Sequence, residues 1–399
     1  MKNYIGIDVG GTKVDLVLAD EEGNILFSEK YDSPFLETGN RLADEETDAE
    51  ITGSEGKEVL LDKFKSGIGM GIRFHKYLEG AVVDFRKKAR NKRKLKGTID
   101  GIGASLCGTV RKDESGFYFL GANTPNRFVN NRLGIQVSQL ETLAEIPFAA
   151  ANDGNAAAKA QGIFYKARLG LDPKKTGYAI LGTGFGFGVP DTDAQTELGH
   201  IPIGFVHSTL MQKCGCTDGR IYTRCAENYA SGGGMERIVR DVSALSNLDL
   251  QELAQYERLG YRAEDLKEAI RGSELNYMPD GEKITTAKIM SVAYNGDAFA
   301  EWVVNLAAQT TAYALVSAAQ MFGLERIGVG ESVAINNPWH VENIAEIVED
   351  MVKDNKLLPN GLKVEMTPIS ENAAKYGALS LVVPEDRYDM WADAMAQPD

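Results

Sequence analysis

The sequence predicts an α/β fold with two domains, and three observations support this. The chain has 399 residues, which is more than one ordinary hydrophobic core accommodates. After residue 301, segments with helix and strand patterns alternate, as they do in α/β proteins. Two units with the order strand, Gly/Thr turn, strand, at 4–18 and 178–189, indicate two related halves.

The chain begins with three predicted strands, at 4–9, 14–19 and 25–29, which short turns join into an antiparallel meander. Residues 37–58 carry eight acidic groups and few apolar ones, so we expect an exposed insertion or a mobile loop there. Helical periodicity returns over 59–85. The remaining elements expected in this half are a strand at 98–105, a helix at 132–145 and a strand at 147–151.

The second half continues with an alanine-rich segment at 155–168, which predicts a helix. A strand at 178–181 is followed by a glycine turn at 182–184. Residues 301–322 form a long, largely apolar pattern, and such a helix should be buried on most sides. The chain is then expected to form a strand at 326–329, a helix at 340–353, a strand at 362–367 and a helix at 372–382.

Charge and hydropathy disfavour several classes of protein. The formal net charge of −14 argues against broad nucleic-acid binding. No apolar run approaches the roughly 18 residues of a membrane-spanning helix, and no signal-peptide pattern follows Met1, so we expect a cytoplasmic protein. Residues 86–96 hold eight Lys or Arg and no acid; an exposed helix end is favoured there over a phosphate or polyanion contact.

The turn after the first strand carries a candidate phosphate site. Gly10 and Gly11 let backbone N–H groups approach an anion, while Thr12 adds a hydroxyl donor and Lys13 a cation. Asp8 sits where a Mg²⁺ ion bound to that phosphate would need a carboxylate. A hairpin with a polar turn explains the same residues, so the motif alone leaves both interpretations open.

A second candidate phosphate turn is Gly182-Thr183-Gly184, which opens a run with four glycines in seven residues. The alternative is a flexible turn between two strands. The spacing is not that of a P-loop, because no Lys-Ser/Thr pair follows.

Asn152 and Asp153 stand between a predicted strand and a predicted helix. Asp153 could act as a general base. It could equally cap the helix, since Asp and Asn are favoured capping residues. The motif alone favours capping.

Four side chains after residue 199 form a set that suits tetrahedral zinc. They are His200, Cys214, Cys216 and Cys225. All four positions would be filled by protein, so the ion would be structural, with no open place for an activated water. His207 is a competing imidazole, and the alternative is a group of reduced, buried cysteines.

Five motifs in this order resemble those of the ROK family, which holds bacterial sugar kinases and sugar-responsive repressors. The motifs are Asp-x-Gly-Gly-Thr-Lys, Asn-Asp-x-Asn-Ala, Gly-Thr-Gly-x-Gly, Glu-x-Gly-His and Cys-x-Cys…Cys-x-Glu. The resemblance covers nearly the whole chain. It implies the two-lobed ribonuclease H-like fold of the sugar kinase, Hsp70 and actin superfamily, with ATP and a sugar bound in the cleft between the lobes.

The resemblance also implies the limits of the lobes. The N-terminal lobe would span 1–150, with an insertion at about 37–97, and the C-terminal segment at about 384–399 would join it. The C-terminal lobe would span 151–383 and contain the zinc site. A homodimer is a further expectation from the family.

By the same resemblance, Asp153 is the catalytic base that takes a proton from a sugar hydroxyl. The residues implied to bind sugar are Asn152, Glu197, His200 and Glu227. Those implied to bind ATP and Mg²⁺ are Asp8, Gly10, Gly11, Thr12, Lys13, Gly182, Thr183, Gly184 and Gly330. Zn²⁺ would be held by His200, Cys214, Cys216 and Cys225, and would orient His200 and Glu227 toward the sugar.

The chain departs from the family pattern at three places. The spacing from the second to the third cysteine, Cys216 to Cys225, is longer than is usual in the family. The loop at 103–108 lacks the usual proline, and the turn at 328–331 has fewer glycines than usual. These differences bear on which sugar and which nucleotide are used.

A kinase that phosphorylates a hexose, with glucose favoured and the 6-hydroxyl as acceptor, is the expected function. N-acetylmannosamine, N-acetylglucosamine and fructose are alternative substrates. A sugar-binding protein without turnover and a sugar-responsive repressor are alternatives of another class. The family's repressors carry a helix-turn-helix domain before the first phosphate turn, whereas Asp8 lies seven residues from Met1, so we expect no such domain.

Overall fold

The computed structural model contains two compact units. The first comprises Met1–Pro173, Gly188–Gln195 and Glu371–Asp399, and the second comprises Lys174–Phe187 and Thr196–Ser370. The structure describes residues 1–10, 13–32, 68–113, 116–120, 135–136, 146–192, 196–203, 212–213, 222–223, 225–244, 262–276, 283–353, 355–358, 360–369 and 372–397.

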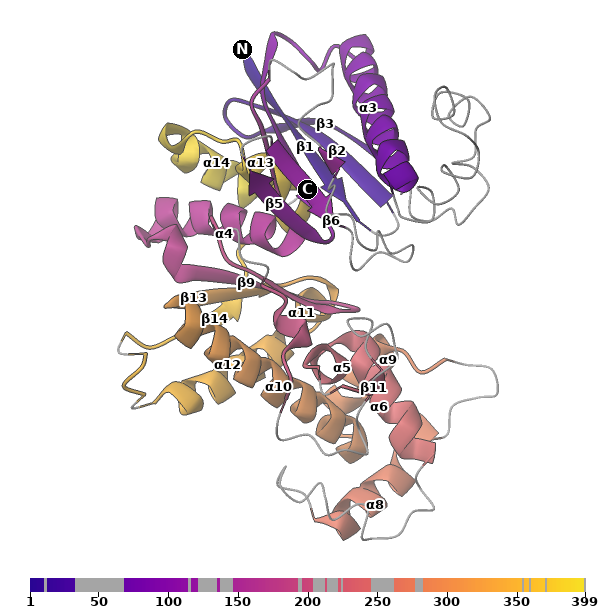
Figure 1. Cartoon of the computed structure of the whole chain (residues 1–399). Helices are drawn as coiled ribbons and strands as arrows, with labels where there is room; N and C mark the ends of the chain where they lie inside the picture. Colours follow the sequence, from indigo (N-terminus) through magenta and orange to yellow (C-terminus); the bar gives the residue numbers. More distant parts are fainter. Residues whose placement is uncertain are drawn as a thin grey trace. The chain divides into compact units, whose positions relative to one another are not determined.

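A five-stranded mixed sheet with the order β3-β2-β1-β4-β8 forms the centre of the first unit (Figure 1). Its strands are β1 (Lys2–Val9), β2 (Lys13–Asp20), β3 (Ile25–Asp32), β4 (Thr98–Leu106) and β8 (Phe148–Asn152). The first three strands pair antiparallel, which confirms the predicted meander, and β4 and β8 continue the sheet in parallel with β1.

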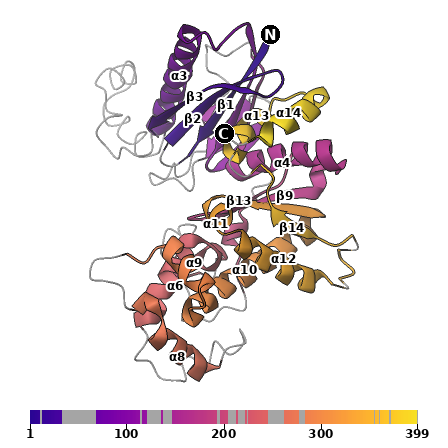
Figure 2. The same cartoon turned by 180° about the vertical axis from the view of Figure 1, so that it is seen from behind.

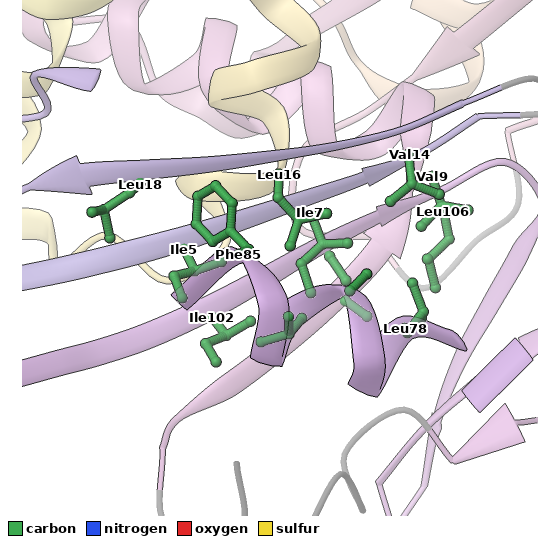
Figure 3. Packing of buried hydrophobic residues seen from close by; sticks show 14 of the residues in the cluster. Ile5, Ile7, Val9, Val14, Leu16, Leu18, Leu78, Phe85, Ile102 and Leu106 are labelled. Atoms are coloured by element: carbon green, nitrogen blue, oxygen red, sulfur yellow. The ribbon is translucent and has the colours of Figure 1, made fainter. Parts of the chain in front are cut away.

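Helix α3 (Ile68–Asn91) covers one face of this sheet and completes a hydrophobic core with it. Leu78 of α3 lies beside Leu106 of β4, and Phe85 of α3 lies near Ile5 and Leu16 of the strands (Figure 3). All five side chains are fully buried. The second half of the segment expected as an insertion, 37–97, thus includes a helix that packs into the core of the unit.

Three helices pack together in the first unit: α4 (Asp153–Leu169), α13 (Ala373–Ser380) and α14 (Tyr388–Met395). Helix α13 contacts β1 and β4. Its Tyr376 hydroxyl donates to the Gly23 carbonyl in the turn between β2 and β3, and its Ser380 hydroxyl donates to the Ala156 carbonyl of α4. The sequence placed the lobe boundaries at 150 and 384. The contacts of α4 and α13 instead group both helices with the first sheet.

A small antiparallel sheet follows β4 along the chain. It contains β5 (Thr109–Asp113), β6 (Gly116–Leu120) and β7 (Ile135–Gln136). The helix predicted at 132–145 is wrong at 135–136, where the backbone pairs with β6. The rest of that predicted helix lies outside the described residues.

The second unit is built on a four-stranded sheet with the order β10-β9-β13-β14. Its strands are β9 (Thr176–Leu181), β10 (Phe185–Gly188), β13 (Arg326–Gly330) and β14 (Lys363–Met366). Strands β9, β13 and β14 run parallel, so their carboxyl ends meet at one edge. Such an edge is where α/β proteins place their ligands.

Helices supply the rest of the described part of this unit. They are α5 (Glu227–Ala230), α6 (Gly232–Ala244), α8 (Ala263–Gly272), α9 (Thr286–Tyr294), α10 (Ala298–Phe322), α11 (Ser332–Asn336) and α12 (Pro338–Val352). The apolar helix α10 packs against α9 and α12 (Figure 2). Most of its side chains are buried, as its composition predicts. Asp297 caps its first turn, and Gly323 ends it in a left-handed conformation.

Among the helices that the structure describes, none combines the length and apolarity that a membrane span requires.

Candidate functional site

In the first unit, the carboxyl ends of β1, β4 and β8 bring polar side chains to one edge of the sheet. Asp8 pairs in register with Ser105, and Leu106 pairs with Asn152. The Ser105 hydroxyl, which is buried, donates to Oδ1 of Asp8 at 2.7 Å. This bond fixes one oxygen of the half-buried Asp8 carboxylate.

Helix α4 begins at this edge, and its cap is Asn152 rather than Asp153. The Asn152 Oδ1 accepts from the backbone N–H groups of Gly154 and Asn155, and its Nδ2 donates to the Gly108 carbonyl at 3.0 Å. Asp153 is the first helical residue; its Oδ1 accepts from the Gly154 N–H at 2.9 Å. The preference for Asp153 as the cap, drawn from the motif alone, is therefore wrong.

The Cys107 thiol, directly after β4, lies close enough to Asp153 and Asp8 for both charges to act on it. Burial, together with the negative charges of Asp153 and Asp8, raises the pKa of Cys107 to about 12. Both carboxylates thus act on one point at the end of β4. The structure brings the predicted base and the predicted magnesium ligand to the same edge.

The first phosphate turn is described at its two ends only. The Gly10 N–H donates to the Lys13 carbonyl at 2.9 Å, which closes the hairpin between β1 and β2. The Lys13 ammonium lies 3.6 Å from an Asp15 oxygen and is largely exposed. Gly11 and Thr12 lie outside the described residues.

The second phosphate turn, Gly182–Gly184, is held by the N-terminus of α6. The Gly232 N–H donates to the Gly182 carbonyl at 2.9 Å, and the Gly233 N–H donates to the Thr183 carbonyl at 3.1 Å. The positive end of α6 therefore lies beside this turn, where it favours an anion. The three consecutive glycines at 232–234 are a sequence signal of this close backbone approach, and it was missed.

Glu227 connects the second phosphate turn to the residues implied to bind sugar. Its Oε2 accepts from the Phe185 N–H at 3.3 Å, directly after the turn. A Cβ built on Gly184 would lie 3.0 Å from the same oxygen. A Cβ built on Gly199 would meet the Phe185 carbonyl and lie 3.4 Å from the Glu227 Cβ. The segment that carries Glu197 and His200 is therefore packed against both the turn and Glu227.

Glu197 and His200 lie close to each other, with 3.8 Å between the Glu197 Oε2 and the His200 Nε2. Cys225 is placed near them by the chain: it forms a β-bridge with Pro202, and the Ala226 N–H donates to the Ile201 carbonyl at 3.0 Å. The other predicted ligands and the competing imidazole lie outside the described residues: they are Cys214, Cys216 and His207. The described elements of this stretch are β11 (Gln212–Lys213) and β12 (Tyr222–Thr223).

The zinc prediction stays a prediction, because Cys214 and Cys216 lie outside the described residues. Within the described ranges, no group of three or more His, Cys, Asp or Glu side chains could hold a metal ion. Two of the four predicted ligands fall outside those ranges, so the complete set is not represented.

At the carboxyl end of β13, Gly330 leads into Glu331, which the sequence analysis did not single out. A Cβ built on Gly330 would overlap the hydroxyl of the buried Tyr178, so only glycine fits there. Glu331 adopts φ 73° and ψ 177°. A side chain in this region of backbone space costs about 1–3 kcal/mol, and such residues cluster at ligand sites.

Two features of the site were missed because they depend on spatial relations. Ser105 reaches Asp8 only through the parallel register of β1 and β4, which no local pattern specifies. Glu331 is notable only for its backbone angles. The sequence signal for Glu331 was its place in the turn at 328–331, which has fewer glycines than is usual in the family.

The ROK family model matches residues 73–385 of the chain. The chain belongs to the ROK family. A curated relative, the glucokinase of Streptomyces coelicolor, is 27% identical over 244 residues, which are 59% of this chain. The match spans 58% of that relative's length.

Solved structures of ROK proteins share the fold. A ROK family glucokinase from Streptomyces griseus, in complex with glucose and AMPPNP, has 20% identity and a TM-score of 0.54, over 95% of this chain and 98% of that one. A ROK family transcriptional regulator, a homologue of the E. coli MLC protein, has 16% identity and a TM-score of 0.63, over 99% of this chain and 81% of that one. The family thus includes both kinases and regulators.

Proposed function

We propose that this ROK protein transfers the γ-phosphoryl group of ATP to a hydroxyl of a hexose. The observation that carries the proposal is the edge of the first sheet, where Asp153 begins α4 and Asp8 is held by Ser105. A carboxylate base and a carboxylate suited to Mg²⁺ are the charged groups that a sugar kinase requires. The named kinases among the relatives give independent support.

Phosphoryl transfer depends mainly on positioning and charge neutralisation. In the proposed reaction the sugar hydroxyl oxygen forms a bond to the γ-phosphorus, the bond from that phosphorus to the bridging oxygen breaks, and ADP leaves. Asp153 accepts the proton that the hydroxyl releases. The turns at Gly10–Lys13 and Gly182–Gly184 bind the phosphates through backbone N–H groups. Asn152, Glu197, His200 and Glu227 hold the sugar, and Gly330 contributes to the nucleotide site.

Asp8 would hold Mg²⁺, directly or through water, and the ion would neutralise charge on the transferred phosphate. The residue fits this role because carboxylate oxygens are the ligands that Mg²⁺ prefers. Ser105 occupies one Asp8 oxygen by a hydrogen bond and so orients the carboxylate.

We further propose that His200, Cys214, Cys216 and Cys225 hold a structural Zn²⁺ ion. Three thiolates and one imidazole suit tetrahedral zinc. The bridge between Cys225 and Pro202 brings one predicted thiol ligand close to the chain that follows His200. An ion held there would orient His200 and, two residues after Cys225, Glu227.

The two sheets, with their order of antiparallel and parallel strands, support assignment to the two-lobed ribonuclease H-like superfamily of sugar kinases, Hsp70 and actin. We propose glucose as the substrate, phosphorylated at the 6-hydroxyl, because relatives are named glucokinases. N-acetylmannosamine, N-acetylglucosamine and fructose are the alternative acceptors. A cytoplasmic location and a homodimer are proposed from the family resemblance alone.

A regulator is the second candidate, since a ROK transcriptional regulator shares the fold. One experiment separates the two functions: ADP release with ATP, Mg²⁺ and a panel of hexoses and N-acetylhexosamines. We expect one sugar of the panel to stimulate ADP release strongly. Sugar binding without ADP release from any member of the panel would contradict the kinase proposal and favour a regulator or a sugar-binding protein.

A further inference from the structure

Glu331 is a charged residue in a backbone conformation that glycine adopts most readily. It follows β13 directly, with φ 73° and ψ 177°. Strands β9 and β13 are parallel and paired from Arg326 to Gly330, so the Glu331 backbone lies at the same edge as the turn after β9. The chain therefore places a carboxylate at the ligand-binding edge of this sheet, where a glycine would be unstrained.

The neighbour of Glu331 at this edge is the second phosphate turn. A Cβ built on Gly182 would lie 3.6 Å from the Glu331 Cβ and 3.4 Å from the Ser332 Oγ. Gly182 is also the residue whose carbonyl accepts from the first turn of α6. Glu331 thus lies beside one end of the turn that we assign to the phosphates of the nucleotide.

Packing beneath the turn holds Glu331 in this position. The hydroxyl of Tyr178 fills the volume that a side chain on Gly330 would need, and Thr367 packs against the same volume. Burial raises the pKa of Tyr178, and the charge of Glu331 raises it further. The Tyr178 ring therefore supports the backbone just before Glu331 and lies within reach of its charge.

We propose that the Glu331 carboxylate accepts hydrogen bonds from the ribose hydroxyls of the bound nucleotide. This inference rests on the proposed function. A carboxylate repels phosphate, so the group of a nucleotide that it favours is a neutral donor beside the phosphates. The ribose hydroxyls are such donors, and the phosphates are assigned to the neighbouring turn. Glu331 is thereby a specificity residue for the sugar of the nucleotide.

The test removes a ribose hydroxyl from the nucleotide and, separately, the negative charge from the side chain that would accept from it. Binding of ADP, 2′-deoxy-ADP, 3′-deoxy-ADP and IDP is measured by calorimetry for the natural protein and for Glu331→Gln. Glutamine keeps the shape of the side chain and removes the charge. We expect the natural protein to bind ADP about 10- to 100-fold more tightly than at least one deoxynucleotide, as for a hydrogen bond to a charged group. Glu331→Gln should reduce that ratio about tenfold or more.

Two further variants separate recognition from folding. Glu331→Gly should also lose the discrimination between ADP and the deoxynucleotides, and it should melt at a higher temperature because the backbone strain is relieved. Glu346→Gln removes a carboxylate from an exposed position on α12 and should keep the discrimination of the natural protein.

The proposal is overturned if the natural protein and Glu331→Gln discriminate equally against the deoxynucleotides. It is also overturned if Glu331→Gln weakens all four nucleotides by the same factor, or changes only the ratio of ADP to IDP. Both the proposed function and this inference would be overturned if the natural protein bound no ADP and if no sugar of the panel caused it to release ADP from ATP. ADP binding and sugar kinase activity without ribose discrimination would overturn the inference alone.

Discussion

Asp153 occupies a position at which two roles compete for one carboxylate. At the start of a helix an aspartate is commonly a cap, but here the cap is Asn152, whose Oδ1 takes the N–H groups of Gly154 and Asn155. The capping function is thus met by the preceding residue. Asp153 remains at the edge of the sheet near Asp8, where the charges of both raise the pKa of Cys107.

The Asp153→Asn variant tests the role of this residue. We expect turnover to fall by at least about 10²- to 10⁴-fold, because the variant cannot accept the proton of the sugar hydroxyl. Sugar binding, followed by calorimetry or by the rise in melting temperature with ligand, should persist.

The matched control is Asp265→Asn, which removes an exposed carboxylate on α8 whose partner is the Arg262 guanidinium at 2.9 Å. That variant should retain activity within a few fold. Kinase activity in Asp153→Asn comparable to that of the control would contradict the assignment of Asp153 as the base.

Among the elements, α4 begins with the proposed base and is fixed near its N-terminus by the segment after β10. The Asn155 Oδ1 accepts from the Val189 N–H at 3.1 Å, and Lys159 pairs with Asp191 in the same segment. A Cβ built on Gly188 would overlap the backbone of Gly154. The position of Asp153 therefore depends on a glycine that is far away in sequence.

The Gly188→Ala variant should displace the first turn of α4. We expect lower stability, by about 1–3 kcal/mol as for overpacking, and a loss of turnover that exceeds the loss of nucleotide binding. The control is Gly80→Ala on α3, where an added Cβ meets no atom within 4 Å. Alanine there should raise stability by about 0.5–1 kcal/mol. Equal melting temperatures and activities for the two variants would contradict the packing argument.

Helix α12 contains a buried imidazole, His340, which is fully inaccessible. Among the described residues, neither of its ring nitrogens has a hydrogen-bond partner. Burial lowers its pKa from 6.5 to about 4. The folded protein thus holds His340 neutral at a pH where the unfolded chain would bind a proton.

The sign of the resulting pH dependence follows from that difference. Below pH 6.5 the unfolded state binds more protons, so stability falls as the pH drops toward 4. A shift of this size corresponds to about 3 kcal/mol over the window. We expect His340→Leu to lose less stability than the natural protein between pH 7 and pH 4 in urea-unfolding experiments. Parallel pH profiles for the two proteins would contradict the prediction.

The elements also show how far sequence patterns reach. The meander β1–β3 and the helix α10 were predicted with nearly correct limits, because alternation and continuous apolarity are local properties. The packing of α3 could not be predicted in the same way, because its periodicity indicates a helix but not that Leu78 and Phe85 pack on the first sheet. Strand β7 has two residues, too few to produce a pattern.

For the whole molecule too, the sequence predicts local features of the site but not the relations between distant segments. The order of motifs identified the family and placed the polar residues at strand ends, since motif order is a property of the sequence. Which residue caps α4, how Ser105 orients Asp8 and why Glu331 is strained depend on register and backbone angles. Those relations arise only when separate segments meet.

At the scale of the whole molecule, the proposed zinc ion would join segments that the fold otherwise holds by few described contacts. Cys225 and His200 lie on chains linked by the Pro202 bridge and one backbone hydrogen bond, and Glu227 follows Cys225 by two residues. Removal of the ion should therefore loosen the residues proposed to bind sugar more than the turn proposed to bind the nucleotide, which α6 holds independently.

We expect about one zinc per chain by elemental analysis of the purified protein. Cys214→Ser and Cys216→Ser should each lower the zinc content, reduce the melting temperature and raise the KM for sugar by more than the KM for ATP, because His200 and Glu227 would lose their orientation. Cys107→Ser, which alters a thiol outside the predicted set, should retain the metal. The ligand assignment would be contradicted if both ligand variants kept their zinc or if Cys107→Ser lost it. The proposed link between the ion and the sugar would be contradicted if zinc were lost but the KM values for sugar and ATP changed equally.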